Sequence, residues 1–305
     1  MRALASPASL KGVLSAPEAA ALLAEGLRDG GADVEELPIA DGGEGTGEVL
    51  GARVAAHVRA HDAFGRPREA PIRRLPDNKA LVEAADVIPL DPARLDPVAA
   101  SSRGLGELIA RVDAERLLVC LGGTATMDGG AGLRKVLSEL PAPTTVLCDT
   151  LALLLDAPRL FAPQKGATPE QVELLERRLA AMGELEPYAE LPGAGAAGGL
   201  GAALASLGAE LVPGAREVLG RLDFRARARR ADLVVTGEGT VDETTATGKA
   251  PGQALLACRE EGMRCVVFGG RVEVDLAGAE VVALSGDPDR AAEDLVELGR
   301  RLAHA

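Results

Sequence analysis

The sequence predicts an α/β protein of two domains: a Rossmann-like domain with a parallel sheet, built from both chain ends, and an inserted α/β domain with a short antiparallel meander. Three observations carry this prediction. At both ends of the chain, apolar runs of strand length alternate with segments of helical period. Between them, residues 54–88 form successive extended runs without room for helices. The length of 305 residues allows one large domain or two.

The first elements predict one βαβ unit. Residues 2–6 are expected to form a strand, and Ser15-Ala-Pro-Glu18 predicts a capping box that starts a helix. This helix should run to about residue 28 and end at Gly30-Gly31. A second strand, residues 34–40, leads into a glycine-rich acidic turn, residues 41–46.

After the meander, strands and helices alternate again from residue 101. We expect a helix over 102–114, a strand over 116–121, a helix over 132–140 and a strand over 144–148. Thr168, Pro169 and Gln171 predict the capped start of another helix, to about residue 182. The Gly/Ala-rich residues 192–207 predict a loop that leads into a tightly packed helix.

The last third has the regular α/β pattern. The expected elements are, in order, helix 214–221, strand 231–236, helix 251–261, strand 264–268, strand 280–284 and a closing helix after Asp287-Pro288. The first βαβ unit and this last third should form one parallel sheet. The predicted domains are therefore residues 1–46 with 208–305, and the inserted residues 47–207.

Composition argues against membrane-spanning and nucleic-acid-binding proteins. No run of 18 or more apolar residues occurs, and the first residues lack the apolar core of a secretory signal. A formal net charge of −13 and 2% aromatic residues leave neither the basic patches nor the stacking rings that nucleic-acid binding needs. We therefore expect a soluble, cytoplasmic protein whose partner is a small molecule, with homodimer formation left open.

The cysteines and histidines give no sign of a metal site. Cys120, Cys148, Cys258 and Cys265 are scattered, without a C-x-x-C pair, which indicates buried reduced thiols. His57 and His61 stand four residues apart, but their segment is predicted to be extended, so the helical spacing of a zinc site does not apply.

Two segments match short binding motifs only in part, and a third common motif is absent. Residues 193–198, GAGAAG, match G-x-G-x-x-G but follow no predicted strand, so close helix packing is favoured over dinucleotide binding. The TGK at residues 247–249 is no P-loop, because Ala250 stands where a Ser or Thr would hold magnesium. No G-x-S-x-G is present, so a serine hydrolase has little support.

Several glycine-rich turns carry carboxylates or lysines. They comprise residues 40–46, 122–130, 164–167 and 236–249, with Lys11 in a further loop. Ligands of open α/β sheets bind outside the carboxyl ends of the strands, so these turns are expected to converge. Phosphoryl transfer needs this mixture of main-chain N–H groups, lysines and carboxylates. Taken singly, Asp41 and Asp128 could also be turn-forming residues, Glu238 and Asp242 could belong to a solvated loop, and Lys165 could be a surface lysine.

Taken together, these motifs resemble the bacterial type I glycerate kinases. The resemblance is carried in order by residues 9–12 (SLKG), 38–46 (PIADGGEGT), 122–132 (GGTATMDGGAG), 148–149 (CD), 161–167 (FAPQKGA), 192–201 (PGAGAAGGLG) and 231–239 (ADLVVTGEG), followed by Lys249 and Pro251. It implies a two-domain α/β kinase that transfers the γ-phosphoryl group of ATP to D-glycerate, typically at the 2-hydroxyl, with Mg²⁺.

Roles follow from residue type and from the resemblance. The catalytic candidates are Lys11 and Asp149, the latter as proton acceptor. The substrate-binding candidates are Asp41, Glu44, Thr124 and Asp128. The phosphate- and nucleotide-binding candidates are Gly122, Gly123, Lys165, Gly237 and Lys249. The candidate magnesium ligands are Glu238 and Asp242.

The chain departs from the family pattern at several polar positions. Ala8, Met127, Ala152 and Thr244 stand where the family has Asp, Asn, Asn and Gln. Two alternatives therefore stay open: a catalytically weakened paralogue that binds a nucleotide or a small hydroxy acid, and a kinase for a different hydroxy acid.

Overall fold

The computed structural model describes residues 1–304 and divides the chain into two compact units. The terminal unit contains residues 1–40 and the chain from residue 215, and the inserted unit contains residues 41–214. The predicted fold class is confirmed: the chain is mixed α/β, with one parallel sheet and one sheet that also contains antiparallel pairs. The domain boundaries expected from the sequence remain a prediction.

The terminal unit contains a five-stranded parallel sheet. Its strand order is β11-β10-β9-β1-β2, so strands from both chain ends share one sheet, as predicted. The strands are β1 (Arg2–Ala5), β2 (Asp33–Glu36), β9 (Leu233–Val241), β10 (Cys265–Val272) and β11 (Glu280–Ala283). The order reverses between β1 and β9, which makes the carboxyl ends of these two strands the topological switch point.

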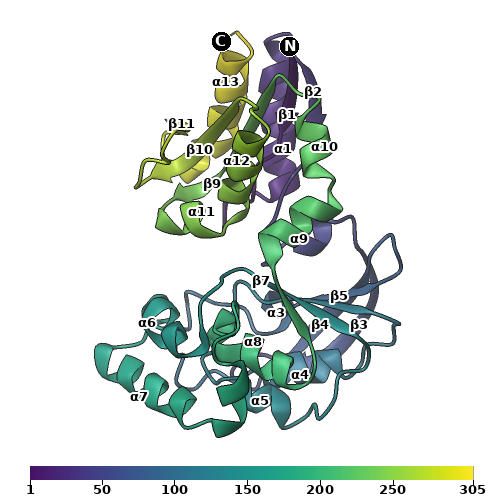
Figure 1. Ribbon diagram of the computed structural model, residues 1–305, viewed down its shortest axis with the longest axis vertical. Helices are drawn as coiled ribbons and strands as arrows, with labels where there is room; N and C mark the ends of the chain where they lie inside the picture. The colour runs from purple at the N-terminus through teal and green to yellow at the C-terminus, as the bar shows by residue number, and fades with distance from the viewer. Residues whose placement is uncertain (305) are drawn as a thin grey trace. The chain divides into compact units, whose positions relative to one another are not determined.

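Helices cover both faces of this sheet (Figure 1). One layer contains α1 (Ala16–Asp29) and α13 (Ala291–Leu302), and the other contains α9 (Gly214–Arg221), α10 (Phe224–Ala228) and α12 (Ala250–Glu260). Side chains alternate along β1, because Ala3 and Ala5 face the first layer whereas Leu4 faces the second. Two short helices, α11 (Glu243–Thr247) and the 3₁₀ turn η4 (Pro288–Arg290), complete the unit.

The inserted unit contains a six-stranded mixed sheet of order β3-β4-β5-β6-β7-β8. Its strands are β3 (Arg53–His61), β4 (Pro67–Arg74), β5 (Ala80–Glu83), β6 (Leu117–Cys120), β7 (Thr144–Cys148) and β8 (Glu210–Pro213). Antiparallel pairing of β3 with β4 and of β4 with β5 confirms the meander, and the remaining pairs are parallel. Both His57 and His61 lie on β3, which confirms the extended prediction for that segment.

Short helices surround this second sheet. They are α2 (Thr46–Val49), α3 (Ala84–Val87), α4 (Arg103–Ile109), α5 (Ala131–Arg134), α6 (Ala157–Phe161), α7 (Pro169–Ala180) and α8 (Ala196–Ser206), with 3₁₀ turns η1 (Leu154–Asp156), η2 (Pro163–Lys165) and η3 (Gly183–Tyr188). The capping box predicted at Thr168 is present, because its hydroxyl accepts the Gln171 N–H and the Gln171 side chain accepts the Thr168 N–H. The same arrangement joins Ser15 and Glu18 at α1.

The GAGAAG segment serves close packing, as predicted. A Cβ on Gly195 would lie 2.4 Å from the Leu153 carbonyl oxygen, and one on Gly198 would lie 2.2 Å from the Thr126 carbonyl oxygen. Gly198 also has φ +72°, a conformation that side chains other than glycine rarely adopt. These glycines therefore bring the start of α8 against the loops that follow β6 and β7.

Several predicted boundaries are wrong. The helices expected over 102–114 and 132–140 are only α4 and the four-residue α5, and the strand expected over 34–40 ends at Glu36, just before Leu37-Pro38. Proline has no N–H to continue a ladder. The strand expected to end at residue 236 continues to Val241, because β10 pairs with it along its whole length.

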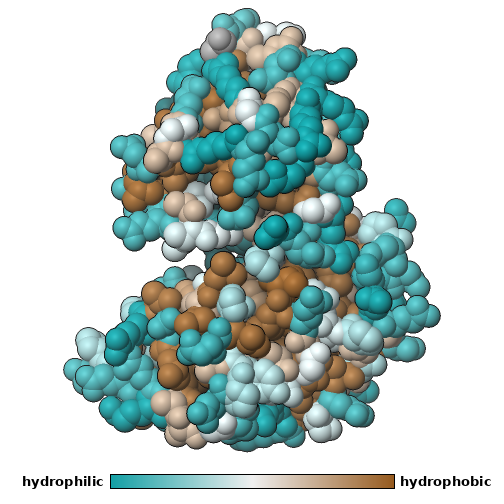
Figure 2. Space-filling view, in the orientation of Figure 1, coloured by the Kyte–Doolittle hydropathy of each residue, from teal (hydrophilic) through white to brown (hydrophobic). Residues whose placement is uncertain are grey.

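The apolar interior includes all four cysteines, which are buried and free, as predicted. Within residues 1–304, no helix has the length and apolar character needed to cross a membrane. Figure 2 shows mostly hydrophilic side chains on the visible surface of the terminal unit, whereas apolar side chains gather on the visible face of the inserted unit. The exposed apolar side chains of the inserted unit include Leu151, Leu155, Leu160 and Leu191.

Candidate active site

The carboxyl ends of three neighbouring parallel strands carry polar groups in the inserted unit. Glu83 is the last residue of β5 and is in register with Cys120 at the end of β6, which in turn pairs with Leu147 of β7. Gly122 follows β6, and Asp149 follows β7 directly. Ligands of parallel sheets bind at this edge.

The loop of residues 41–47 touches this edge. A Cβ on Gly122 would lie only 2.6 Å from the Cα of Gly43 and 3.0 Å from Oδ2 of Asp149. The Gly122 N–H also donates to the Gly42 carbonyl oxygen at 3.4 Å. The structure therefore brings together two of the predicted glycine-rich turns and Asp149, and only glycine fits at the point of closest approach.

The predicted substrate-binding residues differ in exposure. Asp41 Oδ1 accepts the Gly43 N–H at 3.2 Å, which is the hydrogen bond of a turn-forming aspartate. Glu44 is exposed, and a Cβ on Gly123 would lie 3.9 Å from the Glu44 Cβ. Thr124 is buried, and its main chain forms a bridge with Pro89. Of these side chains, that of Glu44 is the most accessible to a ligand.

Asp128 is bound by donors of its own chain. Its Oδ2 accepts the N–H and the hydroxyl of Ser102, both at 2.9 Å, and the Gly132 N–H at 3.0 Å. Its Oδ1 accepts the Gly130 N–H at 3.1 Å. This geometry supports the loop of residues 122–130 and the start of α4. Direct contact of Asp128 with a substrate remains a prediction.

Lys165 joins a third predicted turn to the same loop. Its side chain is only 5% exposed, and Nζ donates to the Thr126 carbonyl oxygen at 2.9 Å. The turn closes at Gly166, whose φ of +92° is in the left-handed region. A buried ammonium group beside the loop of residues 122–130 favours anions there.

The two thiols near this edge are poor nucleophiles. Burial, and then the charge of Asp149, raises the pKa of Cys148 to about 12. Burial, followed by the charge of Glu83, also raises the pKa of Cys120 well above its usual value. A thiol is reactive as thiolate. Covalent catalysis by cysteine is therefore disfavoured, and the carboxylates are the basic groups of this edge.

The terminal unit presents a second group of predicted residues at its switch point. After β1 the chain follows β9, because the N–H groups of Ser6 and Ala8 donate to the carbonyl oxygens of Val235 and Gly237 at 2.7 and 2.8 Å. The backbone nitrogen of Lys11 lies 3.6 Å from the place where a Cβ on Gly239 would stand. The Lys11 side chain is exposed.

Lys249 lies between the two predicted magnesium ligands. Its Nζ is 3.3 Å from Glu238 Oε2 and 3.3 Å from Asp242 Oδ2. The Thr245 hydroxyl donates to Glu238 Oε1 at 2.7 Å. Burial lowers the pKa of Lys249, but the charges of Glu238 and Asp242 outweigh it and leave that pKa raised. Burial raises the pKa of Asp242, but the Thr244 hydroxyl and then Lys249 leave it lowered.

The donor chemistry of this cluster fits Mg²⁺. Mg²⁺ prefers oxygen ligands and commonly takes one or two carboxylates, completing its shell with waters and substrate phosphates. Glu238 and Asp242 supply such a pair, with Lys249 as a competing cation. Among the residues that the structure describes, no group of three or more His, Cys, Asp or Glu side chains is placed to hold a metal ion.

Gly237 lies in a strand, whereas the sequence suggested a turn. A Cβ there would be 2.3 Å from the Phe268 carbonyl oxygen, so the absence of a side chain lets β9 and β10 approach. The turn begins at Asp242, whose Oδ1 accepts the N–H groups of Thr244 and Thr245 at 2.8 and 3.2 Å. A nucleotide contact of Gly237 remains a prediction.

The residues that depart from the family pattern have structural roles of their own. Met127 is 1% exposed and belongs to an apolar cluster with Leu154. The Thr244 hydroxyl donates to Asp242, and the Ala152 carbonyl oxygen accepts the Gly195 N–H at 2.9 Å. Ala8 packs beside the core of the terminal unit. Thus the side chain of Met127 packs in the apolar core of the inserted unit.

Sequence reasoning missed Glu83. Its carboxylate accepts the N–H groups of Gly45 and Gly47 at 3.0 and 2.7 Å, although it is only 2% exposed. The available signal was a single acidic residue ending the apolar run Ala80-Leu-Val-Glu83. Buried carboxylates occur almost only with partners.

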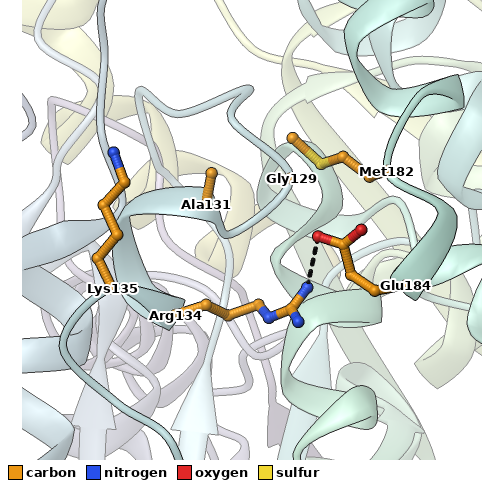
Figure 3. A pocket seen from close by; sticks show the side chains of 6 residues that line it. All are labelled: Gly129, Ala131, Arg134, Lys135, Met182 and Glu184. Carbon is orange, nitrogen blue, oxygen red and sulfur yellow. Dashed lines mark hydrogen bonds and ion pairs between the residues drawn. The ribbon is translucent and has the colours of Figure 1, made fainter.

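A hollow of about 280 Å³ lies elsewhere on the inserted unit (Figure 3). It is lined by Gly129, Ala131, Arg134, Lys135, Met182 and Glu184. An ion pair of 2.9 Å joins Arg134 and Glu184 across it, as Figure 3 shows. None of the predicted site residues lines this hollow, so we assign it no part in the site.

Comparisons with known proteins agree across the chain. The model of the glycerate kinase family matches residues 3–140 and 140–286. The chain is 32% identical to a glycerate kinase of Bacillus subtilis (strain 168), covering 90% of this chain and 86% of that protein. It is 33% identical to the glycerate 2-kinase of Escherichia coli (strain K12), covering 82% and 80%. A crystal structure assigned as glycerate kinase 2 of Salmonella typhimurium LT2 matches with a TM-score of 0.78 at 31% identity, covering 100% and 97%.

Proposed function

Because the chain belongs to the glycerate kinase family, we propose that it transfers the γ-phosphoryl group of ATP to the 2-hydroxyl of D-glycerate, which gives 2-phosphoglycerate. One observation carries the proposal beyond family membership. The Asp149 carboxylate follows a parallel strand directly and lies beside Gly122, which in turn contacts the glycine-rich loop of residues 41–47. A carboxylate at the carboxyl end of a parallel strand stands where ligands of such sheets bind, and it can accept the proton of an acceptor hydroxyl.

On the acceptor side, we assign Asp149 as the proton acceptor. As the hydroxyl oxygen bonds to the γ-phosphorus, its proton passes to Asp149 and the bond to the leaving oxygen of ADP breaks. Asp41, Glu44 and Thr124 shape the hydroxy-acid pocket, and Asp128 acts through the loop that it supports. The carboxylate and phosphate charges are met by Lys165 and the main chain of Gly122 and Gly123.

On the donor side, the switch point of the terminal unit is assigned to the phosphates of ATP. Lys11, Lys249 and the backbone around Gly237 would meet the phosphate charge, and Glu238 and Asp242 would hold Mg²⁺. When bound, Mg²⁺ neutralises charge on the phosphate oxygens. Nζ of Lys249 lies 3.3 Å from both carboxylates, which places its positive charge beside the proposed Mg²⁺ ligands.

The test is an assay of ADP release with Mg·ATP and D-glycerate. The wild type should turn over at about 1–100 s⁻¹, as kinases do. Asp149→Asn should lower kcat by about 100-fold or more, because general-base catalysis contributes that much. Exposed Asp156→Asn is the matched control, Lys11→Ala should also collapse turnover, and ³¹P NMR of the product identifies the phosphorylated hydroxyl.

One observation favours a different hydroxy acid as the second candidate substrate. Leu151, two residues beyond Asp149, is 45% exposed, and Leu155 is 48% exposed. An apolar surface of this kind suits an acid with a larger apolar substituent. Faster turnover with such 2-hydroxy acids than with glycerate would select this alternative. No turnover with any acid, combined with nucleotide binding by the folded protein, would select the weakened paralogue.

We also propose a cytoplasmic location, which rests on the sequence alone; homodimer formation stays an open alternative to the monomer. Cell fractionation tests the first, and light scattering on the purified chain tests the second. A mass of about 31.2 kDa per particle would rule out the dimer.

A further inference from the structure

Glu83 is a buried acidic residue to which no role in the reaction has been assigned above. It ends β5 and is 2% exposed. Removing a carboxylate from water is costly unless hydrogen bonds or charges compensate. Each of its two oxygens accepts one such hydrogen bond: Oε2 accepts the Gly45 N–H at 3.0 Å, and Oε1 accepts the Gly47 N–H at 2.7 Å.

These two N–H groups belong to the start of α2. The first N–H groups of a helix have no partner within the helix, and the N-cap residue Gly45 has no side chain to supply one. Gly45 also has φ +84°, which turns the chain sharply just before the helix. Glu83 therefore caps α2 from another strand, 38 and 36 residues along the chain from its two donors.

The fit around Gly47 is close. A Cβ at this position would lie 3.0 Å from Glu83 Oε1 and 2.9 Å from Cδ of Arg73. Arg73 is itself held by an ion pair with Asp86. Burial raises the pKa of Glu83, and the Gly47 N–H, Arg73 and the Gly45 N–H oppose that rise. The carboxylate is thus held by the loop and by one nearby cation.

We propose that Glu83 is a positioning residue of the hydroxy-acid site: it holds the loop of residues 41–47 in the form that presents Asp41 and Glu44. The inference rests on the proposed function, in which those two residues shape the pocket. The same loop touches Gly122 beside Asp149, so a change in its form is transmitted to the acceptor side.

The first test is Glu83→Gln, which keeps the shape but replaces one acceptor oxygen by an NH₂ group. Whichever way the amide is turned, a donor then faces the N–H of Gly45 or Gly47. We expect kcat/KM for D-glycerate to fall by about 10- to 100-fold, mainly through KM for glycerate, with KM for ATP within about twofold of wild type. Glu83→Asp keeps the charge and should restore part of the loss.

Glu48→Gln is the matched control, because Glu48 is exposed on α2 itself. It should leave both KM values unchanged. Wild-type kinetics for Glu83→Gln would overturn the proposal, as would an equal rise of KM for ATP and for glycerate, which would indicate a general structural defect.

Amide hydrogen exchange, followed by NMR, tests the contact without an activity. The Gly45 and Gly47 amides should exchange slowly in the wild type and at least about tenfold faster in Glu83→Gln, with the amides of β6 unchanged. If the wild type does not phosphorylate glycerate, the proposed function fails, while the exchange data still decide whether Glu83 holds the loop. If the variants do not fold, fast exchange of these two amides in the wild type would by itself overturn the proposal.

Discussion

At the scale of single residues, Asp41, Glu44 and Asp128 of the inserted unit differ in their hydrogen-bond partners and exposure, although each stands next to glycines in the sequence. Asp41 and Asp128 each stand beside two glycines, and both accept hydrogen bonds from N–H groups of their own turns. Asp128 also reaches Ser102, 26 residues away in the chain, whereas Glu44 stays exposed. Residue type therefore indicates what a side chain can do chemically. The hydrogen-bond donors around each carboxylate decide whether that carboxylate is still accessible to a ligand.

Asp128→Asn is expected to destabilise the protein. An amide keeps only one acceptor oxygen, so at best the three bonds to Oδ2 survive and an NH₂ group faces the Gly130 N–H. The loss of a charge-assisted hydrogen bond should lower the free energy of unfolding by about 1.5–3 kcal/mol in urea titrations. Exposed Asp113→Asn should change it by less than about 0.5 kcal/mol. Equal effects of the two substitutions would contradict the supporting role of Asp128.

The Asp242 and Lys249 pair predicts a pH dependence with two limbs. The pKa of Asp242 is lowered in the folded state, so its contribution to stability is present above its unfolded pKa of about 3.9 and is lost as pH falls through the folded pKa. The pKa of Lys249 is raised, so its contribution is present below about 10.4 and is lost as pH rises through the folded pKa.

Lys249→Met should therefore remove the alkaline limb and bring the pKa of Asp242 back toward its usual value. The measurements are the free energy of unfolding against pH and a ¹³C NMR titration of Asp242. Lys135→Met, on an exposed side chain, is the control and should leave the Asp242 titration unchanged. An Asp242 pKa that does not move in Lys249→Met would show that the pair does not couple.

At the scale of elements, helix α1 approaches α13 closely enough to exclude side chains at the contact. A Cβ on Gly26 would lie 2.0 Å from the Val296 carbonyl oxygen, and one on Gly299 would lie 2.5 Å from the Leu23 carbonyl oxygen. Both helices bury their apolar faces on the same side of the parallel sheet. The two glycines thus set the distance between the helices.

Gly26→Ala should lower stability although alanine favours helices. The gain in helix propensity is about 1 kcal/mol, whereas overpacking costs about 1–3 kcal/mol and here meets main-chain atoms that cannot turn aside. Gly220→Ala is the matched control, because this exposed glycine of α9 has open space around it. It should raise the free energy of unfolding by about 0.4–1 kcal/mol in urea titrations. A stabilising Gly26→Ala would contradict the close approach.

At the scale of the whole molecule, each unit offers a separate set of charged groups at the carboxyl ends of a sheet. The inserted unit carries Asp149, Glu44 and Lys165, and the terminal unit carries Lys11, Lys249, Glu238 and Asp242. With a net charge of −13, the chain has a general repulsion for anions that these few cations and N–H groups must overcome locally. Replacing a single lysine should therefore weaken the binding of an anionic ligand measurably.

Ligand stabilisation separates the roles of the two units. A ligand at 100 times its Kd should raise the free energy of unfolding by about 2.7 kcal/mol. We expect Lys249→Met to lose the effect of Mg·ATP and keep that of D-glycerate, and Glu44→Gln to show the reverse, in thermal unfolding at fixed ligand concentration. Loss of both effects in either variant would refute this division of roles.

The sequence by itself determined the α/β class, the antiparallel meander, the capping boxes of α1 and α7, and the glycine-rich turns of the inserted unit that hold polar residues. These features depend on the period of apolar side chains and on hydrogen bonds between residues close in the chain, so short stretches of sequence are enough to predict them. Only the tertiary structure decided that β9 continues to Val241, that Asp128 accepts hydrogen bonds from Ser102, and that Glu83 caps α2. Each of these rests on a partner brought in from a distant part of the chain, and no local pattern encodes which distant groups will meet.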